Sequence, residues 1–286
     1  MTKRIVWTTD LHLNHVPLNA WEQWIDTVRR HSPDALIVTG DISESDDVVF
    51  QLNRIAEAFA IPIYFVLGNH DFYQSSIGKT RRLVIDATRD NPLLHYLVDC
   101  GPIELANDVF LVGEDGWGDA TRGSYETSPI RLNDFARIKD FYLYDPSRWK
   151  SLLQEQGKLS AERLEQKLGA LPSSTKHVLV ATHLPPFCES CWYQGETTDE
   201  NWAPFFVCGQ VGDVLLRFAA SHKDRNYTVL CGHTHHDGIA TMAENLIVYT
   251  GAAQYGRPDV EAEIGVSQQS LELSLSRPPG SMMDAP

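Results

Sequence analysis

The chain has 286 residues, of which 24 are lysine or arginine and 38 are aspartate or glutamate, giving a formal net charge of −14. This length can bury a large core, and a hydrophobic share of 43% excludes general disorder. An acidic chain without a run of basic residues repels a phosphate backbone, so we expect no binding to long nucleic acids.

Other function classes are also disfavoured by composition. No stretch of about 18 apolar residues occurs, and the N-terminal segment has no long apolar core, so we predict no membrane association and a cytoplasmic location. The five cysteines are few and odd in number, which favours free thiols. Cys188 and Cys191 form a C-x-x-C pair, but no second pair completes a zinc site, so a metal or redox role is less favoured.

The first third of the chain alternates β-prone runs with amphipathic segments. Residues 4–9, 35–39 and 61–67 are rich in strand-forming side chains and are predicted to be strands. Residues 18–31 and 45–60, which separate them, are predicted to be helices. This order implies parallel strands with helices packed on a face of the sheet.

The remaining elements follow in a less regular order. We predict strands at residues 94–98, 103–106, 109–113, 177–182, 227–231, 239–242, 246–250 and 271–275. We predict helices at residues 129–144, 146–171 and 211–222, and a loop at residues 114–128. Because no linker or internal repeat occurs, we expect a single domain over residues 1–277 and a flexible tail at residues 278–286.

Histidine, aspartate and asparagine residues gather just after the predicted strands. The carboxyl ends of strands in an open α/β sheet are where binding sites form, so five separate stretches are expected to converge. Their side chains are those of Asp10, His12, Asp41, Asn69, His70, Asp71, His183, His233 and His235.

This set combines hard oxygen ligands with imidazoles and contains no thiolate. Such a mixture suits manganese, iron or zinc and, less ideally, magnesium. Gly40, Gly68 and Gly232 each precede a ligand-type residue, which fits sharp turns close to an ion. Two ions about 3.5–4 Å apart need a bridging carboxylate and several flanking ligands, and the set is large enough for both.

In chain order these residues form the blocks D-x-H, G-D, G-N-H-D, H and G-H-x-H, spread over residues 10–235. The series resembles the five blocks of the calcineurin-like metallophosphoesterase family. The resemblance implies a four-layer α/β/β/α sandwich with two mixed β-sheets flanked by helices. It also implies two divalent metal ions, one held by Asp10, His12 and His235 and the other by Asn69, His183 and His233, with Asp41 between them.

The activity that the resemblance implies is hydrolysis of a small phosphodiester or phosphomonoester by a metal-bridging hydroxide. His70 would contact the phosphate and act as general acid towards the leaving oxygen. Metal charge, not surface lysine, would attract the substrate. The oligomeric state is left open.

Differences from the motifs of particular subfamilies limit the range of candidate substrates. Phosphoprotein phosphatases carry an arginine soon after the G-D block, whereas this chain has GDISESDD. Some lipid-A pathway pyrophosphatases have an arginine in place of the histidine of the third block, whereas this chain keeps His70. The pattern is most similar to bacterial-type phosphodiesterases, including cyclic-nucleotide hydrolases. A nucleotide is one candidate substrate; a nuclease for short single-stranded oligonucleotides is the alternative, and a non-catalytic scaffold is less favoured because no ligand is lost.

Specificity is expected outside the motifs. We predict Trp117 and Arg122, with Asn69 and His70, as substrate contacts, and Arg131 as a second candidate phosphate clamp. The aromatic stretch at residues 185–206 is a candidate pocket wall, although packing of these loops onto the body is the favoured interpretation.

Three further residues are interpreted from their neighbours in the sequence. Asp71 either caps a turn or orients the site, and Glu44 is interpreted as solvated in preference to backing His70. His236 is expected to point away from His233 and His235 if the strand before it continues extended.

Overall fold

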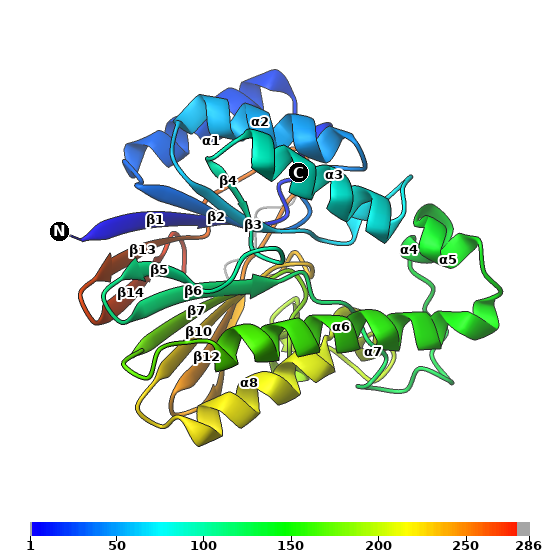
Figure 1. Cartoon of the computed structure of the whole chain (residues 1–286). Coiled ribbons are helices and arrows are strands. Elements are labelled where there is room, and N and C mark those ends of the chain that lie inside the picture. Colours follow the sequence, from blue (N-terminus) through cyan, green and yellow to red (C-terminus); the bar gives the residue numbers. More distant parts are fainter. Residues whose placement is uncertain (1, 279–286) are drawn as a thin grey trace.

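Two six-stranded β-sheets pack face to face in the computed structural model, which describes residues 2–278 (Figure 1). Of the tail predicted at residues 278–286, residues 279–286 lie outside the described residues. The first sheet has the order β14 (Ser270–Leu275), β13 (Ala262–Ser267), β1 (Lys3–Thr8), β2 (Ala35–Thr39), β3 (Ile63–Val66) and β4 (Leu94–Tyr96). The second has the order β11 (Gly238–Ala243), β12 (Leu246–Thr250), β10 (Asn226–Cys231), β7 (His177–Thr182), β6 (Val109–Glu114) and β5 (Ile103–Ala106).

Both sheets are mixed. Strands β1 to β4 are parallel, and β13 and β14 extend that sheet antiparallel. In the second sheet β6, β7, β10 and β12 are parallel, while the edge strands β5 and β11 are antiparallel. The parallel strands therefore direct their carboxyl ends to one end of the sandwich.

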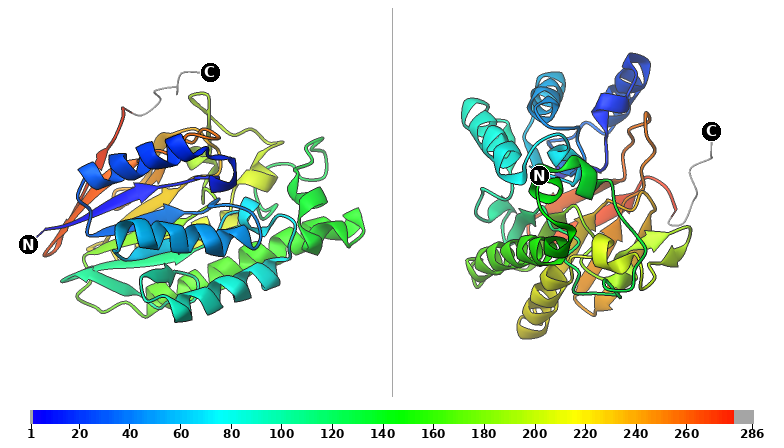
Figure 2. Two further views of the ribbon diagram at one scale, coloured as in Figure 1. Left: turned by 90° about the horizontal axis from the view of Figure 1, so that it is seen from above. Right: turned by 90° about the vertical axis from the view of Figure 1, so that its right-hand side faces the viewer.

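Helices cover the outer face of each sheet. Figure 2 shows α1 (Leu18–Arg30), α2 (Asp47–Phe59) and α3 (Ile77–Asp90) on one side, and α6 (Trp149–Gly169) and α8 (Gly209–Ser221) on the other. The short helices α4 (Asp134–Arg137), α5 (Lys139–Tyr142) and α7 (Ala203–Phe206) lie beyond the sheets. The predicted four-layer α/β/β/α fold is confirmed.

The alternation of side chains between the two faces of each strand explains why helices pack on one face of a sheet and the other sheet packs on the opposite face. In β1, Val6 packs under the helices of the first layer, whereas Ile5 and Trp7 face the second sheet. In β7, Val178 and Val180 pack under α6 and α8, whereas Leu179 faces the first sheet. Because side chains alternate along a strand, one apolar run per strand supplies two separate cores.

Three sequence predictions need correction. The helix predicted at residues 129–144 is replaced by α4 and α5, because Ile138 between them has an extended backbone. Helix α3 was not predicted, since among its residues only Ile77, Thr80 and Val84 are buried. Strand β13 was also missed, although its alternate residues Ala262, Ile264 and Val266 are buried. Within the described residues, no helix combines the length and apolarity needed to cross a membrane.

Candidate metal centre and active site

The five histidine- and aspartate-bearing stretches meet at the carboxyl ends of the parallel strands. Five of these residues have a left-handed backbone, which non-glycine residues rarely adopt. Their φ values are 47° at Asp10, 42° at His12, 49° at Asp41, 71° at His233 and 59° at His235. Such local strain clusters at functional sites, and here it turns each loop so that its side chain faces the others.

Two glycines are required by close approach between these loops. A Cβ added to Gly68 would lie 2.2 Å from Asp41 Oδ1, and one added to Gly232 would lie 2.0 Å from Asp10 Oδ2. Real Cβ atoms do not approach other atoms so closely. The glycine of the G-N-H-D block and that of the G-H-x-H block therefore make room for a carboxylate from a different stretch.

One group of ligand-type atoms is formed by Asp10, His12, Asp41 and His235, whose atoms all lie within 4.8 Å of one another. His12 Nε2 is 3.1 Å from His235 Nε2 and 3.7 Å from Asp41 Oδ2. His235 Nε2 is 3.4 Å from Asp10 Oδ1.

A second group adjoins the first through Asp41. Asn69 Oδ1 lies 3.2 Å from His183 Nε2 and 3.0 Å from His233 Nδ1. His183 Nε2 is also 3.4 Å from Asp41 Oδ1. Asp41 thus presents one carboxylate oxygen to each group, as a bridging ligand would.

Hydrogen bonds behind the second group fix which atoms face inward. His183 Nδ1 bonds to the carbonyl oxygen of Thr39 at 2.8 Å, so in its neutral form the ring directs the Nε2 lone pair inward. Asn69 Nδ2 donates to Asp134 Oδ1 at 2.9 Å, which turns the amide oxygen inward. A lone pair, an amide oxygen and a carboxylate oxygen therefore converge, and a divalent cation fits between them.

Burial sets the protonation of the first group. Burial lowers the pKa of His12 to about 2, against the raising effect of Asp10. Burial and the neighbouring Asp10 raise the pKa of Asp41 well above its ordinary value. Burial also acts to raise the pKa of Asp10, but the hydrogen bond with His235 and the surrounding imidazoles hold it below its ordinary value. A neutral His12 keeps a lone pair available as a metal ligand.

Asp71 ties two of the motif loops together. Its Oδ1 accepts hydrogen bonds from the backbone N–H groups of Ile42 and Ser43, each at 2.9 Å. Its Oδ2 accepts from the N–H of Gly68 at 2.8 Å. The side chain thus holds the loop after β2 against the loop after β3, and it orients both Asp41 and Asn69.

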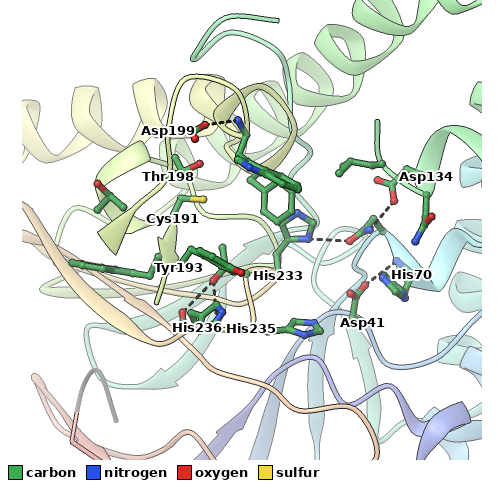
Figure 3. A pocket seen from close by; sticks show the side chains of 18 of the residues that line it. Asp41, His70, Asp134, Cys191, Tyr193, Thr198, Asp199, His233, His235 and His236 are labelled. Carbon is green, nitrogen blue, oxygen red and sulfur yellow. Dashed lines mark hydrogen bonds between the residues drawn. The ribbon is translucent and has the colours of Figure 1, made fainter. Parts of the chain in front are cut away.

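His70 lies beside the two groups. Its backbone N–H donates to Asp41 Oδ1 at 2.8 Å, and its ring centroid is 4.7 Å from that of His12 and 4.3 Å from that of Tyr73. Burial, with the neighbouring His183 and His235, lowers the pKa of His70 to about 3. Its side chain borders the cavity described below, where an ester oxygen would approach (Figure 3).

A cavity of about 770 Å³ opens over the metal-ligand groups (Figure 3). Asp41, Asn69, His70, His233 and His235 form its floor. Its walls come from residues 191–199, from Trp202 and Phe206 at α7, and from Tyr73, residues 132–134 and Tyr255. The sequence favours the interpretation that the aromatic stretch only packs onto the body. It holds for Phe205, which is 3% exposed. It does not hold for the aromatic residues that line this cavity, which are Trp192, Tyr193, Trp202 and Phe206.

The predicted contacts Trp117 and Arg122 are corrected by the structure. Trp117 is 3% exposed and packs between Phe72 and Phe141, with ring centroids at 5.6 and 5.9 Å. Arg122 forms an ion pair with Asp213 at 2.6 Å. Neither residue lines the cavity, because the loop after β6 folds into the body before it reaches the site.

Arg131 and Glu44 also differ from expectation. Arg131 donates to the backbone carbonyls of Ser128 and Ile130. Glu44 accepts from Arg137 at 2.8 Å, and only 16% of its side chain is exposed, so it is an ion-pair partner and not a solvated residue. Arg137 in turn lies over the Tyr73 ring, 4.4 Å from its centroid.

The His236 side chain points away from the ligand groups, but the cause is not the continued extended strand that the sequence suggested. Strand β10 ends at Cys231, and the left-handed backbone at His233 and His235 ends any extended alternation. The His236 ring instead packs edge-on against Tyr193, with centroids 4.7 Å apart. All five cysteines are free, as predicted, and Cys191 borders the cavity.

Three residues near the site were missed by sequence reasoning. The Tyr255 ring lies 4.3 Å from that of His12, in the loop after β12, so the strand-end rule would have identified it. Asp134 accepts hydrogen bonds from both Asn69 and the Tyr73 hydroxyl, the latter at 2.8 Å. Tyr73 follows the G-N-H-D block in the segment after β3, so its neighbours in the sequence could have indicated it, whereas Asp134 does not follow a strand and no sequence signal marks it.

Comparisons with known proteins identify the family and similar folds. The model of the calcineurin-like phosphoesterase family matches residues 3–237. A phosphopantetheinyl hydrolase from Mycobacterium tuberculosis is a similar solved structure at 15% identity and a TM-score of 0.65, over 91% of this chain and 95% of that one. A dimetal phosphatase from Danio rerio is similar at 15% identity and a TM-score of 0.59, over 93% of each chain. No curated protein sequence matches.

Proposed function

Because this chain belongs to the calcineurin-like phosphoesterase family, it is a metal-dependent phosphoester hydrolase, and we propose that it acts on a small phosphodiester or phosphomonoester through a dinuclear centre. The observation that carries the proposal is the placement of Asp41. Its two oxygens face two separate groups of ligand atoms, at 3.7 Å from His12 Nε2 and 3.4 Å from His183 Nε2. A carboxylate shared in this way is what a two-metal site requires.

The ligand assignment follows from the two groups. Asp10, His12 and His235 would hold one divalent ion, Asn69, His183 and His233 would hold the other, and Asp41 would bridge them. Manganese, iron or zinc suits this mixture of oxygen and imidazole ligands. A cytoplasmic location stays a prediction.

His70 is proposed as the general acid. When bound, the two ions supply Lewis acidity for the phosphate oxygens and lower the pKa of a water molecule. The His70 backbone N–H donates to Asp41, which fixes the side chain at the edge of the cavity. Burial and the neighbouring imidazoles lower the pKa of this side chain, and the negative charge of a phosphate bound beside it would favour the protonated form. From that form the imidazole can deliver a proton to the departing ester oxygen.

Neither alternative gains support from a particular residue. A scaffold would not need the ligand-type side chains to converge with their inner atoms aimed at two points. A nuclease for short single-stranded oligonucleotides would be favoured by basic side chains along its groove, and the described residues that line the cavity include no lysine or arginine.

The test is hydrolysis of bis(p-nitrophenyl) phosphate and p-nitrophenyl phosphate by protein loaded with manganese. We expect turnover that a chelator abolishes and added manganese restores. His70→Ala should lower kcat by about 10²–10⁴-fold while the bound manganese measured by atomic emission stays unchanged. His222→Ala, a histidine at the end of α8, is the matched control and should keep full activity. Absence of turnover on both esters and on a nucleotide panel would refute the proposal.

A further inference from the structure

The cavity is much larger than a phosphate group needs. Its volume of about 770 Å³ falls within the range of roughly 300–1,000 Å³ that accommodates organic ligands of drug size. The metal-ligand residues occupy only its floor. The remaining space is therefore available to an organic group attached to the phosphate.

Aromatic side chains line this space. Phe206 lies 4.4 Å from the His233 ring, and Trp202 lies 5.4 Å from Phe206, so a row of rings leads outward from a proposed metal ligand. The Tyr193 ring also lines the cavity and packs nearly at a right angle to the His236 ring. Trp202 and Tyr193 are 42% and 60% exposed, so both have surface left to contact a ligand. Exposed ring faces of this kind stack on flat groups.

The charge on the walls has one sign. Beside the proposed ligand Asp41, the acidic residues that line the cavity are Asp134, Glu196 and Asp199, and no lysine or arginine occurs among the described residues that line it. Asp199 Oδ1 accepts the backbone N–H groups of Asn201 and Trp202, whereas Glu196 lies exposed in the short strand β9 (Glu196–Thr197). A second anionic group on the substrate would lie among carboxylates with no basic side chain on the wall to pair with it.

From the volume, the rings and the charge we infer that the substrate carries, beside the reacting phosphate, a flat ring-bearing group with no second anionic charge. This inference rests on the proposed phosphoesterase function and specifies its substrate class. Esters with one phosphate and a neutral or cationic ring system belong to the class. Polyphosphates and bisphosphates are excluded from it.

Three matched ligands test the inference, each with methyl as one ester group so that at most one nucleoside is present. They are dimethyl phosphate, the methyl ester of thymidine 5′-phosphate, and the same thymidine ester with an added 3′-phosphate. Calorimetric titration of manganese-loaded His70→Ala gives their Kd values, because this variant is expected to be too slow to consume them. We expect the thymidine ester to bind about tenfold or more tightly than dimethyl phosphate, as stacking on aromatic rings predicts. The added 3′-phosphate should weaken binding of the thymidine ester at least about tenfold.

Variants assign these differences to the walls. Combined with His70→Ala, Trp202→Ala should reduce the advantage of the thymidine ester over dimethyl phosphate, and Glu196→Lys should reduce the effect of the 3′-phosphate. Phe50→Ala and Glu155→Lys change an exposed aromatic and an exposed acidic residue outside the cavity, so they should change neither ratio.

Equal Kd values for dimethyl phosphate and the thymidine ester, or tighter binding of the 3′-phosphorylated ester, would overturn the inference. Turnover of p-nitrophenyl esters by the unmodified protein is measured in parallel. Turnover with equal Kd values would refute only the inferred substrate class, whereas absence of turnover with ranked Kd values would refute only the proposed chemistry. If none of the three ligands binds, the inferred substrate class is likewise refuted.

Discussion

At the scale of single residues, the backbone of the proposed centre is held in an unfavourable conformation. Asp10, His12, Asp41, His233 and His235 all have positive φ, which costs about 1–3 kcal/mol each for a non-glycine residue. The cost is offset by the buried strands that precede each loop and by hydrogen bonds such as those of Asp71. The proposed ligands are consequently positioned before any ion arrives, which favours rapid and specific metal binding.

The three histidines of the last motif are expected to differ in their effect on metal content. His233→Ala and His235→Ala should each lower bound manganese from about two ions towards one per chain, because each removes a ligand of a different ion. His236→Ala should leave it unchanged, because that ring packs on Tyr193. Metal analysis after gel filtration measures this. Equal losses in all three variants would contradict the assignment.

The sequence located the proposed ligands better than it located the residues around them. Each proposed ligand lies within four residues after the end of a strand, so local sequence determines where it lies. Trp117 and Arg122 sit in a long loop whose path is set by packing against Phe72 and Phe141 and by the ion pair with Asp213. Contacts of that kind involve residues distant in the sequence, and no periodicity reports them.

At the scale of elements, the short helix α4 has a role that its length does not suggest. Its first residue, Asp134, bonds to Asn69 and Tyr73, while Arg137 at its end stacks on Tyr73 and pairs with Glu44. The helix thus supports the Asn69 amide from behind. Partners of metal ligands in this position typically contribute 10–100-fold in metal affinity.

Removing that support should weaken the binding of one of the two ions, the one that Asn69 is proposed to hold. Asp134→Leu should lower the affinity for the second manganese ion by about 10–100-fold, because the Asn69 amide is then free to rotate. Asp134→Asn retains an oxygen acceptor and should lower it less. Calorimetric titration with manganese measures both, and Asp145→Leu, at an exposed aspartate outside the cavity, is the control. Unchanged affinity in Asp134→Leu would show that Asn69 is held in other ways.

The elements themselves were predictable where one apolar face is continuous. Helix α1 buries Trp21, Trp24, Ile25 and Val28 at helical spacing, and the sequence indicated it within a residue. Helix α3 contains Gly78 and three arginines, one of which, Arg81, pairs with the buried Asp115. Part of its inner face is polar, so periodicity of apolar residues did not reveal it.

At the scale of the whole molecule, the proposed centre joins the two sheets. Asp10, Asp41 and Asn69 follow strands of the first sheet, whereas His183, His233 and His235 follow strands of the second. Each proposed ion would bind ligands from both sheets. Metal binding should therefore stabilise the packing of one half of the sandwich on the other.

Stability should depend on metal accordingly. At a free manganese concentration of 100 times Kd, each ion that binds to the folded state alone adds about 2.7 kcal/mol to the free energy of unfolding, so the two ions together should raise Tm by roughly 5–10 °C over chelated protein. Differential scanning calorimetry measures this shift. His235→Ala should show a smaller shift and His236→Ala the full one. An equal shift in both variants would place the stabilising ion elsewhere.

The walls of the cavity and its floor come from separate stretches of chain. Residues 191–206 carry Trp192, Tyr193, Glu196, Trp202 and Phe206, and this stretch contains none of the seven proposed metal ligands. The exposed positions of this stretch, Tyr193, Glu196 and Trp202, could therefore be varied in a library while the hydrolytic centre stays intact. Variants that prefer different esters could then be selected, and all of them would share the same metal ligands and His70.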